Sequence, residues 1–158
     1  MILVAGVGNI FLGDDAFGTE VASRMKNRAL PPDVRVVDFG IRGIDLLYEL
    51  LDDHYELVVL VDAMSRGGKP GTLYVLEPEL SDSEKLEFGL QAHDLDPTEV
   101  LKTARSMGAG VEKFRIVGCE PASLDPSEEG IIGLSEPIQS SVDPAIEIVE
   151  CLIREVVQ

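Results

Sequence analysis

The chain has 158 residues, of which 45% are hydrophobic, and its 29 acidic residues outnumber its 13 basic residues to give a formal net charge of −16. This length and composition predict one globular domain, residues 1–158, with a buried core rather than a disordered chain. The acidic surface would repel phosphate backbones and anionic lipid, which argues against nucleic acid or a membrane as partner. It favours a basic or neutral partner or a cation, although acidity can also serve solubility alone.

No apolar run approaches the roughly 20 residues that a membrane-spanning helix needs, so we expect no membrane span. The amino terminus carries no basic segment and no small-residue cleavage site, so we expect no signal peptide. The two cysteines, Cys119 and Cys151, are far apart and form no CxxC motif. These features predict a cytoplasmic protein in a reducing compartment, and we expect it to be a monomer.

The opening segment, MILVAGVGNIFLGDDAFG, predicts a strand followed closely by a helix, with two acidic residues between them. Ile2 to Val7 is a short and mostly aliphatic run, which is typical of a strand buried on both faces. Glycines and an asparagine then favour a tight turn. Asp14 and Asp15 follow, at the start of a helix predicted over residues 15–28. Open α/β folds bind their ligands at such points, near the carboxyl ends of the strands.

Further along the chain, strand-like and helix-like segments alternate. We predict strands at residues 34–37, 57–61, 72–76 and 114–118, and helices at 44–51, 97–107 and from 136 to near the end. Residues 72–76 follow the preceding strand too closely for a crossover helix, so they are predicted to form an antiparallel hairpin or an edge strand. The alternation predicts an α/β fold: a phosphorylase/hydrolase-like three-layer sandwich around a twisted, mainly parallel (mixed) five-stranded sheet.

Acidic residues stand at or just past the ends of the first three predicted strands: Asp15, Asp38 and Asp62. Because parallel strands end at the same edge of a sheet, we expect a shared acidic rim. His93, in the segment QAHDLDP, precedes a predicted helix and could add an imidazole. Two carboxylates and one imidazole can bind a divalent metal, and the imidazole favours zinc, nickel, cobalt or iron over magnesium or calcium. The same groups could act as a general acid and base.

Each of these residues also has a purely structural explanation. Asp14 or Asp15 could cap the first helix. Asp62 could accept backbone hydrogen bonds in a loop, and His93 could be an ordinary surface histidine. Cys119 is interpreted as a small buried hydrophobe, because no histidine lies nearby in the sequence. The residues alone therefore predict an α/β domain with an acidic rim and a candidate metal site.

Several segments taken together resemble the hydrogenase maturation proteases, the endopeptidases that process the large subunit of NiFe hydrogenases. The resemblance rests on segments that occur in the expected order: GVGNIFLGDDAFG (6–18), DFGIRGIDLL (38–47), LVVLVDAM (57–64), PGTLYVLEP (70–78), QAHDL (91–95), RIVGCEPASL (115–124) and GLSEPI (133–138). The glycine-rich opening alone would be unspecific, since Rossmann domains begin similarly. The opening, aspartate and histidine segments together are specific.

The resemblance implies that Asp15, Asp62 and His93 bind a metal. It implies that these residues recognise nickel that is already bound in the large-subunit precursor, and that the enzyme then removes the carboxy-terminal extension of this precursor. Nickel is thus delivered in the substrate, and another divalent metal could occupy the site in the isolated protein. The candidate catalytic residues are Asp15, Asp38 and Asp62. Two cleavage mechanisms stay open: a metal-polarised carbonyl attacked by a bound water, or a water activated by a carboxylate such as Asp38 or Asp62.

Other functions remain to be compared with this one. A dinucleotide site needs Gly-x-Gly-x-x-Gly at the helix start, whereas here the third glycine, Gly13, comes two positions late and two aspartates would repel a pyrophosphate. The resemblance also leaves open a non-catalytic, nickel-dependent binding or chaperone module and a related peptidase with another substrate. The chain departs from the family at two positions, since many relatives carry glutamate instead of Asp15 and Phe39 replaces the first of two glycines.

Overall fold

The computed structural model describes residues 1–78, 96–123 and 130–158. Five strands form one sheet in the spatial order β2-β1-β3-β5-β4. Their bounds are β1 (Ile2–Val7), β2 (Val34–Gly40), β3 (His54–Ala63), β4 (Leu73–Leu76) and β5 (Gly110–Cys119). Four strands are parallel, and β4 runs antiparallel to β5. The predicted mainly parallel, mixed sheet is confirmed, and residues 72–76 supply the edge strand rather than a hairpin with β3.

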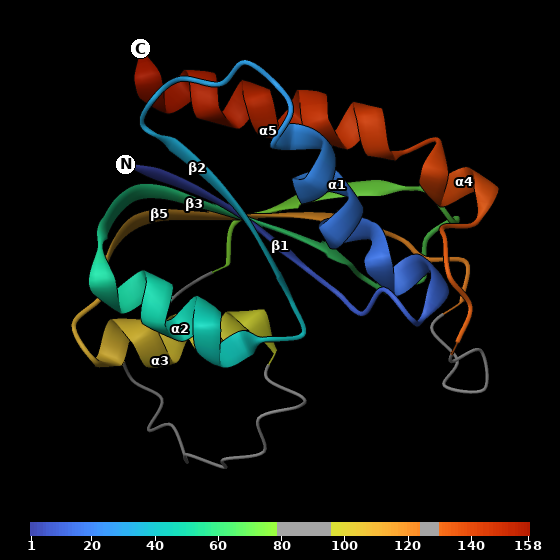
Figure 1. Cartoon of the computed structure of the whole chain (residues 1–158), viewed down its shortest axis with the longest axis horizontal. Coiled ribbons are helices and arrows are strands. Elements are labelled where there is room, and N and C mark those ends of the chain that lie inside the picture. The colour runs from blue at the N-terminus through green and yellow to red at the C-terminus, as the bar shows by residue number, and fades with distance from the viewer. Residues whose placement is uncertain (79–95, 124–129) are drawn as a thin grey trace.

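Helices cover both faces of this sheet. They are η1 (Gly13–Ala16, a 3-10 turn), α1 (Phe17–Met25), α2 (Gly43–Asp52), α3 (Pro97–Ser106), α4 (Glu136–Gln139) and α5 (Val142–Val157). Figure 1 shows α1 and α5 on one side of the sheet and α2 and α3 on the other, as the two core clusters require. The three-layer α/β sandwich is therefore confirmed. Among the described residues, no helix is both long and apolar enough to cross a membrane.

The core has two halves, and each strand contributes to both. In β1, alternate residues pack toward α1 and α5 (Ile2 and Val4) or toward α2 and α3 (Leu3, Ala5 and Val7). All six residues of β1 are buried, which explains its uninterrupted apolar run, because a parallel strand covered on both faces has no solvent-facing side. The same alternation decides toward which face a polar residue at the end of a strand points.

The last helix differs from the prediction, because α4 and α5 are separated at residues 140–141. Pro144 has no N–H with which to continue the helical bonding from the preceding turn. The Ser141 hydroxyl shares its proton between the carbonyl oxygens of Gly71 (2.8 Å) and Pro137 (2.9 Å). Through Ser141, the segment between α4 and α5 is thus hydrogen-bonded to the loop before β4.

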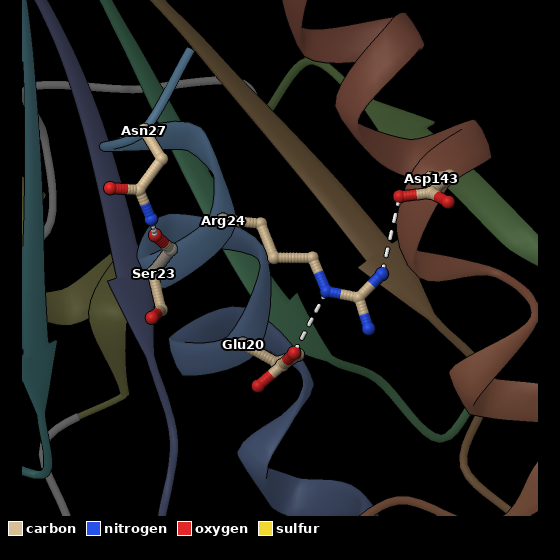
Figure 2. A network of polar contacts seen from close by, with 5 residues as sticks. All are labelled: Glu20, Ser23, Arg24, Asn27 and Asp143. Atoms are coloured by element: carbon tan, nitrogen blue, oxygen red, sulfur yellow. Dashed lines mark hydrogen bonds and ion pairs between the residues drawn. The ribbon is translucent and has the colours of Figure 1, made fainter.

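A polar network joins the outer surfaces of α1 and α5 (Figure 2). Arg24 donates through Nε to Glu20 at 2.8 Å and through a terminal guanidinium nitrogen to Asp143 of α5 at 3.2 Å. Asn27 donates to the Ser23 carbonyl at 3.5 Å. Ion pairs at the surface contribute about 0–1 kcal/mol. The position of α5 is therefore set mainly by its buried apolar residues rather than by this network.

Candidate active site

A pocket of about 150 Å³ at the carboxyl ends of β1 and β3 contains two of the predicted acidic residues, Asp15 and Asp62. Asp15 belongs to η1, and Asp62 is the penultimate residue of β3. The remaining wall consists of glycine backbone and of apolar residues that include Leu46 of α2 and Val100 of α3. Two carboxylates therefore share a small and largely apolar space at the edge of the sheet where α/β proteins bind ligands.

Asp15 is positioned by the turn that follows β1. Its Oδ2 accepts a hydrogen bond from the Asn9 N–H at 2.8 Å. Gly8 has a φ of 147°, and a Cβ at this position would collide with the Asp15 carbonyl oxygen, so only glycine allows the turn to approach so closely. Burial raises the pKa of Asp15, and the bond from Asn9 opposes that rise. The side chain is thus oriented, and within the described residues only its Oδ2 accepts a hydrogen bond.

Asp62 has the most strongly perturbed carboxyl group of the pocket. Burial raises its pKa to about 8, the negative charges of Asp15 and Asp96 add to the rise, and a hydrogen bond from the Ala63 N–H opposes it. Within residues 1–78, 96–123 and 130–158, neither Asp62 nor Asp15 forms an ion pair with a lysine or arginine. The electrostatics of the pocket favour either a proton or a cation between the two carboxylates.

Asp38 lies at the same end of the sheet but on the other face. It alternates with buried Phe39 and shares the orientation of Val36, which packs toward α1 and α5. Asp62 instead shares the orientation of Leu60, which packs toward α2 and α3. The structure therefore brings Asp15 and Asp62 together and places Asp38 in an adjoining hollow.

Asp14, although next to Asp15 in the sequence, is buried away from the pocket. Its Oδ1 accepts from the Ser135 N–H at 2.7 Å, and its Oδ2 accepts from the Ser135 hydroxyl and the Ala122 N–H, both at 2.9 Å. Neither Asp14 nor Asp15 caps η1 or α1 with its side chain. The capping explanation is therefore wrong, and Asp14 instead holds three distant segments together.

Glu120 is a second buried carboxylate that sequence analysis missed. It accepts from the backbone N–H groups of Arg66 (2.7 Å) and Gly67 (2.9 Å) and from the Tyr74 hydroxyl (3.3 Å), and so fixes the loop between β3 and β4. The available signal was a glutamate directly after an apolar strand. Its neighbour Cys119 is fully buried, which confirms the interpretation of Cys119 as a small buried side chain, and burial raises the pKa of its thiol to about 11.

His93 lies outside the described residues, so its role as a ligand stays a prediction. In the described part of the chain, no three His, Cys, Asp or Glu side chains gather closely enough to hold a metal ion. Asp15 and Asp62 fit a divalent metal as oxygen donors, since both are partly buried and each accepts only one backbone hydrogen bond from the described residues. A complete coordination shell requires further donors from elsewhere in the chain or from a bound partner.

A mainly parallel sheet with a carboxylate pair at its strand ends defines an α/β protein whose site is suited to a cation or to acid–base chemistry. Residues 19–151 match the family model of HycI, the hydrogenase maturation proteases. The chain belongs to the hydrogenase maturation protease family and is a hydrogenase maturation endopeptidase.

Individual relatives agree with this assignment. The hydrogenase 2 maturation protease of Escherichia coli is 34% identical over 157 residues, which cover 98% of this chain and 91% of the relative. The solved structure of the E. coli hydrogenase maturating endopeptidase HybD has a TM-score of 0.79 at 30% identity and covers 98% of this chain and 93% of its own. The NiFe hydrogenase maturation protease HycI of Thermococcus kodakarensis has a TM-score of 0.73 at 28% identity, with coverages of 97% and 92%. The predicted family and fold are confirmed.

Proposed function

We propose that this endopeptidase removes a carboxy-terminal extension from the large-subunit precursor of a NiFe hydrogenase. Membership of the family supports the reaction class, since the relatives are named as hydrogenase maturation proteases. The observation that carries the proposal is the pairing of Asp15 and Asp62 in one pocket at the strand ends. Their mutual repulsion favours a cation in the pocket.

We further propose that nickel bound in the precursor is the recognition element and thus part of the substrate. Asp15 and Asp62 would offer oxygen donors and His93 a nitrogen donor, a set that suits nickel better than magnesium or calcium. A precursor without nickel cannot form these bonds, so the enzyme would discriminate against it. Docking through the metal would hold the neighbouring peptide chain against the pocket, which favours reaction by fixing its position.

The enzyme would act on this precursor in the cytoplasm and as a monomer. Both cysteines, Cys119 and Cys151, are free. Free thiols are the usual state in a reducing compartment.

The direct test mixes the purified protein with its cognate precursor in nickel-loaded and nickel-free forms and follows both by intact mass spectrometry. We expect the loss of a carboxy-terminal peptide from the nickel-loaded form alone. Equal cleavage of both forms would contradict recognition through nickel. Nickel-dependent complex formation without cleavage would favour a non-catalytic binding module instead. Absence of both binding and cleavage would contradict the proposed client.

A further inference from the structure

A second hollow, of about 290 Å³, adjoins the carboxylate pocket on the side of β2. The turn after β1, the end of β2 and the loop into α2 form its walls. It shares Gly8, Gly40 and Ile41 with the pocket that contains Asp15 and Asp62. A peptide chain that passes over these three shared residues can therefore place one part in the pocket and a neighbouring side chain in the hollow.

Large apolar side chains line the hollow and are exposed to solvent. The exposed fractions are 47% for Ile10, 55% for Phe11 and 59% for Ile41. Covering apolar surface contributes about 25 cal/mol per Å². The walls are therefore suited to the hydrocarbon part of a bound side chain.

The acidic group that lines the hollow is the Asp38 carboxylate. Its Oδ1 accepts from the Thr19 hydroxyl at 3.1 Å and from the Gly40 N–H at 2.9 Å. Its Oδ2 has no hydrogen bond in the described part of the chain, and no lysine or arginine there pairs with this carboxylate. Asp38 thus presents to the hollow one oriented oxygen and a carboxylate that forms no ion pair with the described lysines and arginines.

Arg42 also lines the hollow, but its guanidinium is engaged elsewhere. It pairs with the Asp45 carboxylate at 3.0 Å and donates to the backbone carbonyls of Phe39 (3.2 Å) and Asp38 (3.0 Å). These contacts orient the guanidinium toward Asp45 and the backbone, and it forms no bond with the Asp38 carboxylate. The charge available to a ligand in this hollow is therefore negative.

We propose that this hollow binds a lysine or arginine side chain of the precursor close to the scissile bond. The aliphatic stem would lie against Ile10, Phe11 and Ile41, and the cationic group would donate to Oδ2 of Asp38. The Phe11 ring adds a surface on which a cation is favoured. An acidic side chain would be repelled, and an apolar one would bury the Asp38 oxygen without a partner.

This inference rests on the proposed function, because the precursor must occupy the adjoining pocket. It gives Asp38 a specificity-determining role instead of the role of general base. The two roles differ in kinetics. Loss of a recognition contact depends on the identity of the substrate residue, whereas loss of a base lowers kcat for every substrate.

The test uses nickel-loaded precursor in which each lysine and arginine near the cleavage site is replaced, one at a time, by glutamine and by glutamate. At one position we expect the glutamine replacement to lower kcat/KM of the wild-type enzyme roughly tenfold to hundredfold, mainly through KM, as for loss of a hydrogen bond to a charged group. Asp38→Asn should lower kcat/KM for the natural precursor by a similar factor. In that variant the glutamine replacement should then have little further effect, because the two changes remove the same contact. Asp38→Lys should partly restore cleavage of the glutamate precursor.

Asp33→Asn is the matched control, because it removes one exposed negative charge just before the opposite end of β2 and should leave the preference unchanged. A loss of kcat at unchanged KM for all precursors in Asp38→Asn would overturn the proposal and assign Asp38 to proton transfer. Failure of every basic position to couple to Asp38 would also overturn it. Titration of the same precursors for binding keeps the inference separate from the proposed function. If binding prefers a precursor with the basic residue and Asp38→Asn removes this preference, the proposal is supported even when no cleavage occurs. Binding with no such preference would overturn it.

Discussion

Two contrasting pairs of partly or fully buried carboxylates lie near the edge of the sheet where the parallel strands end. Asp14 and Glu120 are each 5% exposed, and each accepts three hydrogen bonds from segments distant in the sequence. Asp15 and Asp62 share a pocket, and each accepts one backbone N–H. A carboxylate saturated with donors holds the fold together, whereas one left short of donors can accept a proton or a cation. Position at the rim alone does not separate these roles.

The largest expected effect comes from removing Asp62, which together with Asp15 forms the pair that accepts few hydrogen bonds. Asp62→Ala should reduce processing of nickel-loaded precursor by more than about a hundredfold, which is the upper range for loss of even an outer hydrogen-bond partner at metal sites. His93→Ala should do the same. Intact mass measures processing, and circular dichroism checks the fold. Global unfolding of either variant would contradict placement at the rim.

Removal of a member of the saturated pair should instead affect stability. Asp14→Ala leaves the Ala122 N–H and both donors of Ser135 unpaired, so we expect a loss of about 3 kcal/mol in the free energy of unfolding. That corresponds to a fall of roughly 6–12 °C in melting temperature. Thermal unfolding measures this change, with exposed Asp33→Ala as control. Equal melting temperatures for both variants would show that the Asp14 contacts contribute nothing.

Glu120→Gln tests the second member of that pair. The amide offers one acceptor oxygen, and its NH2 group must face one of the two backbone N–H donors of Arg66 and Gly67. We expect a loss of about 2 kcal/mol, together with faster hydrogen exchange at these two amides. Unchanged exchange would argue that the loop between β3 and β4 is held by other contacts.

The raised pKa of Asp62 predicts a smaller effect with a defined sign. Between about pH 4 and pH 8 the folded protein retains a proton on Asp62 that the unfolded chain has lost, so the free energy of unfolding falls as pH rises across this range. The contribution of Asp62 to stability is complete below about pH 4 and is lost above about pH 8. Asp62→Asn has no such dependence. The free energy of unfolding of Asp62→Asn minus that of the wild type should therefore be at least about 1 kcal/mol larger at pH 9 than at pH 4. A constant difference between the two proteins across this range would show that the Asp62 pKa is not raised.

Much of the fold could be predicted because its signals are local. The apolar run of β1, the length of each segment and the short link to residues 72–76 indicated a mixed parallel sheet with an antiparallel edge strand. The break near Ser141 was missed, although Pro144 was visible in the sequence. The hydroxyl contacts that complete it involve Gly71, which is distant along the chain.

The candidate site was predictable in part. The ends of the strands placed Asp15, Asp38 and Asp62 at one edge, which the structure confirms. The predicted second strand ends at residue 37, whereas β2 extends to Gly40, so the prediction does not contain the alternation that sends Phe39 into one core and Asp38 toward the other face. Phe39, at which the resemblance implies a departure from the family pattern, is buried, whereas its neighbour Gly40 adopts the positive φ of 55° in the turn after β2.

The role of Asp14 could not be predicted, because its partners lie more than a hundred residues away in the sequence. Local sequence showed only two adjacent aspartates. Which of them faces the pocket depends on contacts between segments that no local pattern reports.

The most direct test compares two matched single variants of these neighbouring residues, Asp15→Asn and Asp14→Asn. Each variant loses one charge and keeps one oxygen acceptor, so composition is identical. For both, cleavage of nickel-loaded precursor and melting temperature are measured. We predict that Asp15→Asn loses cleavage at an unchanged or raised melting temperature, whereas Asp14→Asn has a lowered melting temperature and still cleaves at a temperature where it is folded. The reverse pattern would contradict the division of these carboxylates into a pair proposed to bind the metal of the substrate and a structural pair.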